Sequence, residues 1–431
     1  MKKILALVLA ALMVLSMAAC AESGSTTTTG NAGNSGNQGG DKTTAGVQEF
    51  TLRVWTPAED QNADNNWLEK MEKAFEAAHP EYKIEWVNES CSEGDAVTNV
   101  TTDVTDSADV YMFANDQLGK LITAGGLSQL GGIFEEQVKN DNTEFSVNTV
   151  THTDGGIYGF PVTNNVWFTY YDKTVYTEDD VKSLDTMIEK GKVVIPANDG
   201  WNAGFVFLGV GCTVFGEKGN DAESGIDFGG DKGYMAAKKM IELAALVKDG
   251  KAIQGGMDAG KLIDGDADAI FSGSWSYNDI KNALGDNLGI APLPSFEIEG
   301  KSYPMTALGG TKCVGVNPNS GSVPGKQRCA TLFASFLASE EAQLERYTMR
   351  NVIPAHKALQ ENEAVKSNPV AVAEITTMNN NAVVQSALPE MDKYWTPVAT
   401  FSQNVYAGDI NMDNYKQAVD SLMTQLNEDS L

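Results

Sequence analysis

Residues 262–280, with the sequence LIDGDADAIFSGSWSYNDI, decide how the rest of the chain is interpreted. Gly265 and the acidic residues beside it indicate a turn, and residues 267–271 are an apolar run typical of a fully buried strand. The small residues 272–274 end that strand, and Trp275 follows at once. Because ligands in open α/β sheets bind just beyond the carboxyl ends of the strands, we expect Trp275 to lie at such a place.

The indole of Trp275 has two interpretations. Beside residues too small to obstruct it, an indole forms a flat apolar platform with hydrogen-bonding groups around it. Pyranose rings fit such a platform, since their C–H faces are apolar and their edges carry hydroxyls. In the alternative interpretation Trp275 is a core residue that caps the strand, and burial statistics alone do not separate the two.

Length and composition limit the class of protein. A chain of 431 residues is too long for one ordinary core, which predicts two domains or lobes. Hydrophobic content of 42% and charged content of 21% are typical of a soluble globular protein. The net charge of −27 disfavours nucleic acid, anionic membrane surfaces and anionic ligands as partners, so we expect no nucleic-acid partner.

The N-terminus carries an export signal. Lys2 and Lys3 precede an apolar segment, residues 4–17, that is too short to span a bilayer. The sequence Met-Ala-Ala-Cys at residues 17–20 resembles the lipobox of bacterial lipoproteins, in which the cysteine becomes the lipidated first residue. We therefore expect a signal peptide over residues 1–19 and lipid attachment at Cys20. The alternative is an ordinary secretory signal cut near Ala19.

A polar linker follows the signal. Residues 21–48 are mostly Ser, Thr, Gly, Asn and Gln, which is typical of a flexible tether with a reach of about 30 Å. We expect residues 20–49 to hold a globular body outside the cytoplasm, attached to the cell membrane through the lipid only. Loss of the signal with its two lysines takes the net charge from −27 to −29.

The body alternates between strand and helix patterns. Strands are predicted at 50–55, 82–87 and 109–113, with helices at 65–78 and 96–105 between them, which is βαβ patterning around a parallel sheet. Further helices are predicted at 177–190, 234–248 and 326–338, and further strands at 192–195 and 309–316. The fold class is therefore α/β.

The body also contains four cysteines, Cys91, Cys212, Cys313 and Cys329. Their spacings do not match a zinc site, so no metal is expected. An exported location permits disulfides, and Cys313 and Cys329 would meet if the strand and the following helix pack together.

Several stretches resemble a known family, the extracytoplasmic solute-binding proteins of carbohydrate ABC transporters, and its maltose/maltodextrin-binding branch in particular. Together they cover nearly the whole body from Phe50 onward. They are LRVWTPAED (52–60), DVYMFANDQLGKLITAGGLSQL (109–130), GIYGFPVTNNVWFTYYDK (156–173), LIDGDADAIFSGSW (262–275), NVIPAHKAL (351–359) and ALPEMDKYW (387–395).

The resemblance implies a two-lobed periplasmic-binding-protein fold of type II, in which each lobe is a sheet flanked by helices and hinge crossovers join the lobes. It implies an N-terminal lobe of residues 50–164 plus 306–355 and a C-terminal lobe of residues 165–305 plus 356–431. Ligand would select or induce closure of the lobes, and the transmembrane subunits of an ABC permease would recognise the closed form.

The resemblance also implies the site residues, because each falls on a position of the family's motifs. Gln117 stands where well-studied members carry Arg, Asn165 stands where they carry Glu, and Tyr394 precedes the last stacking aromatic. The candidate sugar-binding residues are Glu59, Asp60, Asp116, Gln117, Asn165, Asp199, Trp201, Trp275, Tyr394 and Trp395. The physical chemistry agrees, since a carboxylate accepts charge-assisted bonds from two adjacent hydroxyls and aromatic faces supply most of the buried area.

Some of these residues have alternative interpretations. Asp116 would also serve as the cap of the helix that follows it. Trp395 lies in a helix-like run, where it would also fit core packing, and Asn165 would also fit a hinge without ligand contact. Trp201 stands between Gly200 and Asn202 in a polar loop, which favours ligand contact.

The sequence therefore predicts a non-enzymatic receptor for a neutral oligosaccharide of the α-glucan class, maltose or maltooligosaccharides, with no cofactor and no catalytic residue. Two alternatives stay open. The same fold would also suit another oligosaccharide or a polyamine. A surface-anchored glycoside hydrolase, which is another class of protein, also uses paired carboxylates in a cleft rich in tryptophan.

Overall fold

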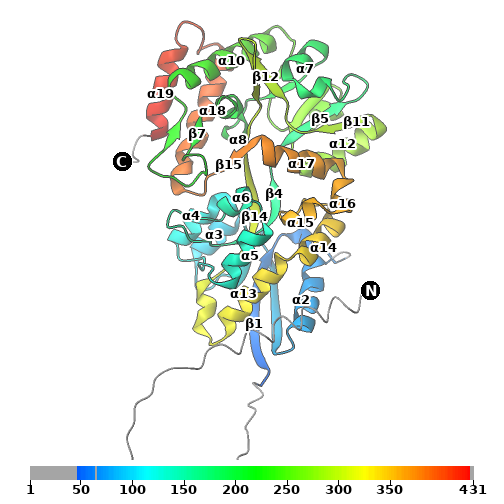
Figure 1. The fold of residues 1–431 in the computed structure, drawn as a ribbon, viewed down its shortest axis with the longest axis vertical. Helices are drawn as coiled ribbons and strands as arrows, with labels where there is room; N and C mark the ends of the chain where they lie inside the picture. The colour runs from blue at the N-terminus through cyan, green and yellow to red at the C-terminus, as the bar shows by residue number, and fades with distance from the viewer. Residues whose placement is uncertain (1–45, 64–65, 428–431) are drawn as a thin grey trace, which may run out of the picture. The chain divides into compact units, whose positions relative to one another are not determined.

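The computed structural model describes residues 46–63 and 66–427. One six-stranded sheet forms the frame of the first part of the chain; in Figure 1 β1 lies near the bottom of the molecule, with β14, β4 and β15 above it. The strand order is β15-β14-β3-β1-β2, and β4 also pairs with β14. The strands are β1 (Gln48–Thr56), β2 (Tyr82–Ser90), β3 (Val110–Ala114), β4 (Phe160–Asn165), β14 (Ala307–Val316) and β15 (Ala382–Val384).

The first three strands confirm the predicted βαβ pattern. Strand β1 runs parallel to β2 along its whole length and parallel to β3 at Val54 and Trp55. Strand β14 then runs antiparallel to both β3 and β4 and parallel to β15. One long strand from late in the sequence therefore joins segments from the beginning, the middle and the end of the chain.

Helices cover this sheet, and α2 shows how the sequence forms them. The Asn66 side chain caps its start by accepting a hydrogen bond from the N–H of Glu69, and the apolar face of α2 is buried. The helices of this part are α2 (Trp67–Ala78), α3 (Ala96–Thr102), α4 (Leu118–Thr123), α5 (Ile133–Asp141), α6 (Glu144–Asn148), α13 (Lys326–Leu337) and α14 (Glu340–Arg350). Short 3-10 helices accompany them: η2 (Ala58–Gln61), η3 (Asn115–Gln117) and η7 (Pro318–Ser322).

The second part of the chain is built on smaller sheets. Strand β5 lies between β10 and β11 and runs antiparallel to both, so the buried strand predicted before Trp275 does not belong to an open parallel sheet. Strands β6 and β9 pair in parallel. The strands are β5 (Phe168–Asp172), β6 (Val194–Pro196), β7 (Thr213–Val214), β8 (Ile226–Asp227), β9 (Ile253–Gly255), β10 (Ala269–Ser272), β11 (Leu288–Ala291), β12 (Ser295–Ile298) and β13 (Lys301–Pro304).

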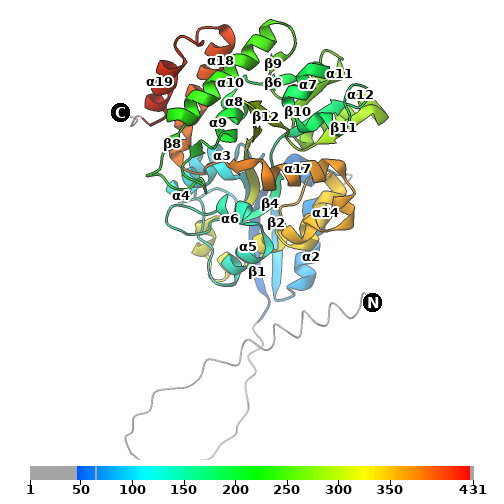
Figure 2. The same cartoon turned by 45° about the horizontal axis from the view of Figure 1, so that its top comes forward.

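Helices surround these strands, and α17 lies beside β4 in both views (Figure 1, Figure 2). The helices are α7 (Leu184–Lys190), α8 (Gly200–Ala203), α9 (Phe205–Gly209), α10 (Gly230–Lys248), α11 (Gly260–Ile263), α12 (Tyr277–Leu284), α15 (Lys357–Gln360), α16 (Glu363–Lys366), α17 (Pro369–Asn380), α18 (Asp392–Ala407) and α19 (Tyr415–Asn427). The 3-10 helices here are η4 (Asp180–Lys182), η5 (Ser274–Ser276), η6 (Gly285–Asn287) and η8 (Pro389–Met391).

The buried apolar side chains form separate cores. The first core is built from residues 52–162 and 313–342 with Ala387, and the second from residues 166–308 and 378–426. A third, smaller cluster lies around Phe168 and Ile353. Strand β14 contributes Leu308 to the second core and Val314 to the first. The domain boundaries given above stay a prediction.

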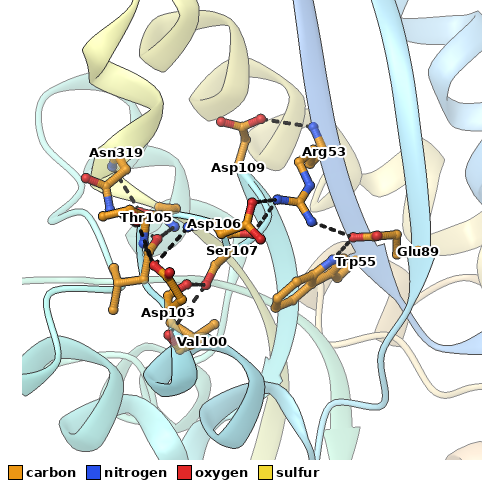
Figure 3. A network of polar contacts seen from close by, with 12 residues as sticks. Arg53, Trp55, Glu89, Val100, Asp103, Thr105, Asp106, Ser107, Asp109 and Asn319 are labelled. Atoms are coloured by element: carbon orange, nitrogen blue, oxygen red, sulfur yellow. Dashed lines mark hydrogen bonds and ion pairs between the residues drawn. The ribbon is translucent and has the colours of Figure 1, made fainter.

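A polar network ties β1 to its neighbours (Figure 3). The guanidinium of Arg53 pairs with Glu89 at 3.0 Å and Asp106 at 2.9 Å. Glu89 also accepts a hydrogen bond from Nε1 of Trp55 at 2.6 Å, and Asp109 accepts one from the backbone N–H of Arg53 at 2.9 Å. Exposed ion pairs contribute little free energy to folding. We therefore expect the main effect of this network to be the positioning of β1 beside β2 and the segment before β3.

The structure differs from the sequence-based expectation at several places. The single helix predicted over 177–190 is divided into η4 and α7, because Ser183 caps a new helix by accepting a hydrogen bond from the N–H of Thr186. The first strand begins at Gln48, within the residues that we assigned to the linker. Cys313 and Cys329 are buried and free, so they do not form the disulfide that we considered.

The predicted signal peptide over residues 1–19 and the lipid attachment at Cys20 lie outside the described residues, as does the linker before Gly46. Within the described ranges, none of the helices combines the length and the apolar character needed to cross a bilayer.

A buried ionic cluster connects η2 to α14. The carboxylate of Asp60 is fully buried and accepts hydrogen bonds from Arg346 at 3.0 and 2.9 Å and from Arg350 at 2.5 Å. Arg346 also donates to the Thr163 hydroxyl at 2.6 Å. The cluster therefore joins the loop after β1, the end of β4 and the last turns of α14.

Replacement of Arg346 by Met tests the weight of this cluster. Since the substitution leaves the buried Asp60 carboxylate with Arg350 alone, we expect the free energy of unfolding to fall by about 3 kcal/mol or more, measured by urea denaturation. Lys70→Met is the matched control, because Lys70 forms an exposed ion pair with Glu345 and its loss should cost about 1 kcal/mol or less. Equal effects of the two substitutions would contradict this account.

Candidate functional site

Two tryptophans from different segments form an aromatic pair. Trp275 lies in η5 with 53% of its surface exposed, so the interpretation as a core residue is wrong. Trp201 lies in α8 and is half-buried against the second core. The centroids of their rings are 6.0 Å apart and the ring planes meet at 33°. The pair presents an apolar aromatic surface, part of which is open to solvent.

Asp199 fixes the position of Trp201. Its Oδ1 accepts hydrogen bonds from the backbone N–H groups of Trp201 at 2.9 Å and Asn202 at 3.2 Å, which caps the start of α8. Its Oδ2 accepts another from Nδ2 of Asn202 at 2.7 Å. Asp199, which we predicted to contact ligand, thus already holds the short helix that carries Trp201.

Helix α8 packs closely on α18 through its glycines. A Cβ atom at Gly200 would lie 2.5 Å from the carbonyl oxygen of Trp395, and one at Gly204 would lie 2.1 Å from the hydroxyl of Tyr394. Tyr394 is fully buried, so in this structure it is a core residue. Trp395 is half-buried, and its ring centroid lies 5.2 Å from that of Tyr394.

Three buried polar atoms around α8 have no hydrogen-bond partner among the described residues. They are Nε1 of Trp201, Oδ1 of Asn202 and the hydroxyl of Tyr394. An unpartnered buried polar atom costs about 1–3 kcal/mol, and such atoms are rare in folded proteins. Their concentration around one helix of four residues marks this region as a candidate binding site.

Asp116 lies in η3 and is half-buried. Burial raises the pKa of its carboxyl, and Lys312 and Lys120 oppose that rise. Helix α4, which follows, starts without a side-chain cap, so Asp116 is not its capping residue. Lys120 pairs with Asp392, the first residue of α18, at 3.0 Å. The charge of Asp392 also raises the pKa of the Asp116 carboxyl, so Asp116 lies near the start of α18.

Gln117 and Asn165 both take part in contacts within the fold. Gln117 is buried and bonds the backbone N–H of Val97 at 2.9 Å and the carbonyl of Gly94 at 2.6 Å, so its amide supports the structure. Asn165 is half-buried at the end of β4, where it pairs with Gly310 of β14.

The two acidic residues after β1 contact arginines of α14. Asp60 belongs to the buried ionic cluster described above, which leaves its carboxylate without access to solvent. Glu59 is exposed and lies 3.9 Å from Arg350. The structure therefore gives Asp60 a structural role and leaves Glu59 accessible.

Sequence patterns missed three residues of this region. Asn164 is buried, and both polar atoms of its side chain lack partners among the described residues. The charge of Lys312 in β14 opposes the rise in the pKa of the Asp116 carboxyl. Glu374 is buried in α17, and a signal for it exists, since it is the only charged residue in PVAVAEITTMNN.

Comparison with known proteins identifies the family. The model of the family described as bacterial extracellular solute-binding protein matches residues 70–373. The chain belongs to this family. The resemblance that the sequence motifs indicated is therefore confirmed.

Relatives of this solute-binding protein agree in fold. A structure solved with acarbose is 40% identical, with a TM-score of 0.77, over 88% of this chain and 99% of that chain. Maltodextrin-binding protein MalE1 from L. casei BL23, solved without ligand, is 28% identical with a TM-score of 0.81, and the match covers 88% of this chain and 99% of that chain. The galactooligosaccharide-binding protein of Bacillus subtilis (strain 168) is 27% identical over 86% of this chain and 87% of its own. The predicted two-lobed α/β fold is confirmed.

Substitution of Gly200 by Ala tests the packing that positions Trp201. The added methyl group would meet the backbone of Trp395, so we expect α8 to shift and the free energy of unfolding to fall by about 1–3 kcal/mol in thermal or urea unfolding. Gly131→Ala is the control, because a Cβ atom added there would have no other atom within 4 Å, and we expect a change within about 0.5 kcal/mol. A Gly200→Ala protein as stable as the control would contradict the close contact of α8 and α18.

Proposed function

We propose that this chain is the extracellular binding component of an ABC importer and that it binds an oligosaccharide, of the α-glucan class, between its two lobes. The observation that carries the proposal is the pair Trp201 and Trp275, with one indole open to solvent in a solute-binding protein. Sugar rings stack on such indoles through their C–H faces.

The candidate polar residues have the chemistry to bind the edges of a sugar. We propose that Asp116 and Glu59 accept hydrogen bonds from hydroxyls, since a carboxylate accepts two at once, and that Trp395 and Asn165 line the same site. Asp199 would act through the placement of Trp201, because its two oxygens already bond α8. The remaining predicted residues, Asp60, Gln117 and Tyr394, would support the site from within the fold.

Binding would close the lobes, and the closed form would be recognised by the transmembrane subunits of a permease. Names of similar proteins support an oligosaccharide as ligand: one binds maltodextrin, one binds galactooligosaccharide, and one was solved with acarbose. The net charge of −27 favours a neutral ligand over an anionic one. A second oligosaccharide class is thus the nearest alternative to an α-glucan.

Calorimetric titration with a panel of ligands tests the proposal. The panel holds maltose, maltotetraose, a β-glucan oligosaccharide, a galactooligosaccharide, a xylo-oligosaccharide and spermidine. We expect the tightest binding with maltotetraose and unchanged sugar after long incubation. Tightest binding of a sugar other than an α-glucan would reassign the sugar, binding of spermidine alone would make the protein a polyamine receptor, and steady release of shorter sugars would make it a hydrolase.

Trp275→Ala tests the stacking surface in the same titration. Because Trp275 is largely exposed, its removal should leave the thermal midpoint nearly unchanged, while the affinity for the best ligand should fall by about tenfold or more. Val323→Ala is the control, since Val323 is also an exposed apolar residue and should affect neither quantity. Undiminished affinity in the Trp275 variant would exclude this indole from the site.

We further propose that Cys20 carries a lipid that anchors the chain to the outer face of the cell membrane. In cells that express the full chain, metabolic labelling with palmitate should mark the protein, and Cys20→Ser should abolish the label and release the protein into the soluble extracytoplasmic fraction. A labelled or membrane-bound Cys20→Ser protein would show that the cysteine is incidental.

A further inference from the structure

Lys312 lies in the second half of β14 and has no side-chain partner in the fold. Its side chain is half-buried, and none of the described residues forms a hydrogen bond or an ion pair with its ammonium group. A half-buried ammonium group loses part of its hydration, so such a group in a folded protein is usually paired. The candidate site as described above does not use Lys312, so its unpaired charge calls for an explanation.

The register of β14 fixes the face of the sheet on which Lys312 projects. Strand β14 lies beside β4 (Figure 1), and Lys312 pairs with Thr163 of β4 and with Ala114, the last residue of β3. Residues directly opposite each other in an antiparallel pair project on the same face. The Thr163 hydroxyl accepts a hydrogen bond from Arg346. Lys312 therefore shares its face with the buried ionic cluster, at the edge of the sheet where β3 ends.

The arginines of that cluster are already paired. Arg346 and Arg350 both donate to the carboxylate of Asp60, and Glu93 lies 3.4 Å from Arg346. Their charges are thus balanced within the fold. Lys312 differs from them, because its ammonium group has no carboxylate partner among the residues that the structure describes. Its charge is available to a ligand.

Asp116 is an acid in the same position. The short helix η3, which carries Asp116, directly follows β3 and packs against β14. Asn115, which precedes Asp116, accepts a hydrogen bond from the backbone N–H of Thr311 at 3.0 Å, so η3 lies beside the segment of β14 that carries Lys312. Within the described ranges, the Asp116 carboxyl has no hydrogen bond or ion pair with another residue. The effect of the Lys312 charge on the pKa of Asp116 agrees with this placement.

Lys312 and Asp116 are complementary, yet they do not form a direct ion pair. An ammonium group only donates hydrogen bonds, and a carboxylate only accepts them. A hydroxyl group does both, so one sugar hydroxyl between the two side chains would satisfy each of them. A neutral ligand rich in hydroxyls is therefore the kind of molecule that fits this place.

Strand β14 also connects this place to the aromatic pair. Helix α8, which carries Trp201, packs against β14, as η3 does. The ring of Trp201 lies 6.0 Å from that of Trp275 between centroids. The two unpaired charges and the aromatic surface are thus arranged on elements that contact one strand.

We propose that Lys312 is a specificity-determining residue of the saccharide site: its ammonium group donates to a ligand hydroxyl that in turn donates to Asp116, and its charge excludes cationic ligands. The exclusion follows because like charges brought together in a partly buried site repel each other. Without Lys312, acids beside aromatic rings would suit a polyamine as well as a sugar. The inference rests on the proposed function, since it assigns a contact within that site.

Lys312→Met tests both effects, because it removes the charge and keeps an unbranched apolar stem. We expect the affinity for maltotetraose, measured by calorimetry, to fall by about tenfold or more, since a hydrogen bond from a charged donor is lost. We also expect spermidine to compete with the sugar in this variant and not in the wild-type protein. Lys312→Arg keeps the charge and the donors, so it should still exclude spermidine.

Lys238→Met is the matched control. Lys238 is a half-buried lysine of α10 whose Nζ lies 5.7 Å from the centroid of the Tyr415 ring, and its loss changes the net charge by the same amount. We expect it to change neither the affinity for maltotetraose nor the exclusion of spermidine. The same loss of affinity in both variants would assign the effect to net charge and overturn the inference.

Thermal unfolding separates ligand contact from a structural role. Because Lys312→Met removes a half-buried charge without a partner, we expect its thermal midpoint to be no lower than that of the wild-type protein. A lower midpoint together with weaker binding would show that Lys312 supports β14, and would overturn its assignment as a ligand contact.

A double-mutant cycle with Asp116→Asn tests the shared hydroxyl. If Lys312 and Asp116 bind the same hydroxyl, the loss of affinity in the double variant should be smaller than the product of the two single losses. Losses that multiply would overturn the shared hydroxyl.

The wild-type protein distinguishes this inference from the proposed function. If it binds none of the oligosaccharides of the panel, the proposed function and this inference fall together. If it binds maltotetraose and Lys312→Met binds it equally well, the inference alone is refuted.

Discussion

Strand β14 is the constraint on which the rest of the structure depends. It pairs with β3 and β4 along one half and with β15 at its start, and it contributes side chains to both large cores. Lys312 in its middle acts on Asp116, and its Gly310 lies against the Asn115 side chain, where a Cβ would come within 2.1 Å of Oδ1. The same strand that connects the cores therefore also positions Asp116, whose carboxylate is a candidate for ligand binding.

Trp201 and Trp275 lie on short elements whose positions depend on contacts with neighbouring helices and strands. Helix α8 has four residues and keeps its place through the Asp199 cap and through its glycines, which allow the backbone of α18 to approach. The turn that carries Trp275 is held by a hydrogen bond from Tyr170 of β5 and packs on α17. Such short helical segments are not stable alone, so the orientation of each indole depends on the elements packed around it.

Prediction from the sequence succeeded for the elements that residues close together in the chain determine. The alternation of strand and helix predicted β1, α2 and β2, and the small residues before Trp275 indicated an accessible indole, as observed. It failed where a partner lies far along the chain. Asp60 is buried because Arg346, 286 residues later, supplies its counter-charge, and no local pattern contains that fact. Gln117 and Tyr394 were likewise placed by their positions in the family's motifs, yet tertiary contacts decide that they support the fold.

The central claim is that the indoles of Trp201 and Trp275 form the surface on which a saccharide stacks. A crystal structure of the protein grown with maltotetraose tests it most directly. The account predicts a pyranose ring in van der Waals contact with the Trp275 indole and hydroxyls within hydrogen-bond distance of Asp116 or Glu59. A sugar bound at another place, with the face of Trp275 still open to solvent, would contradict it.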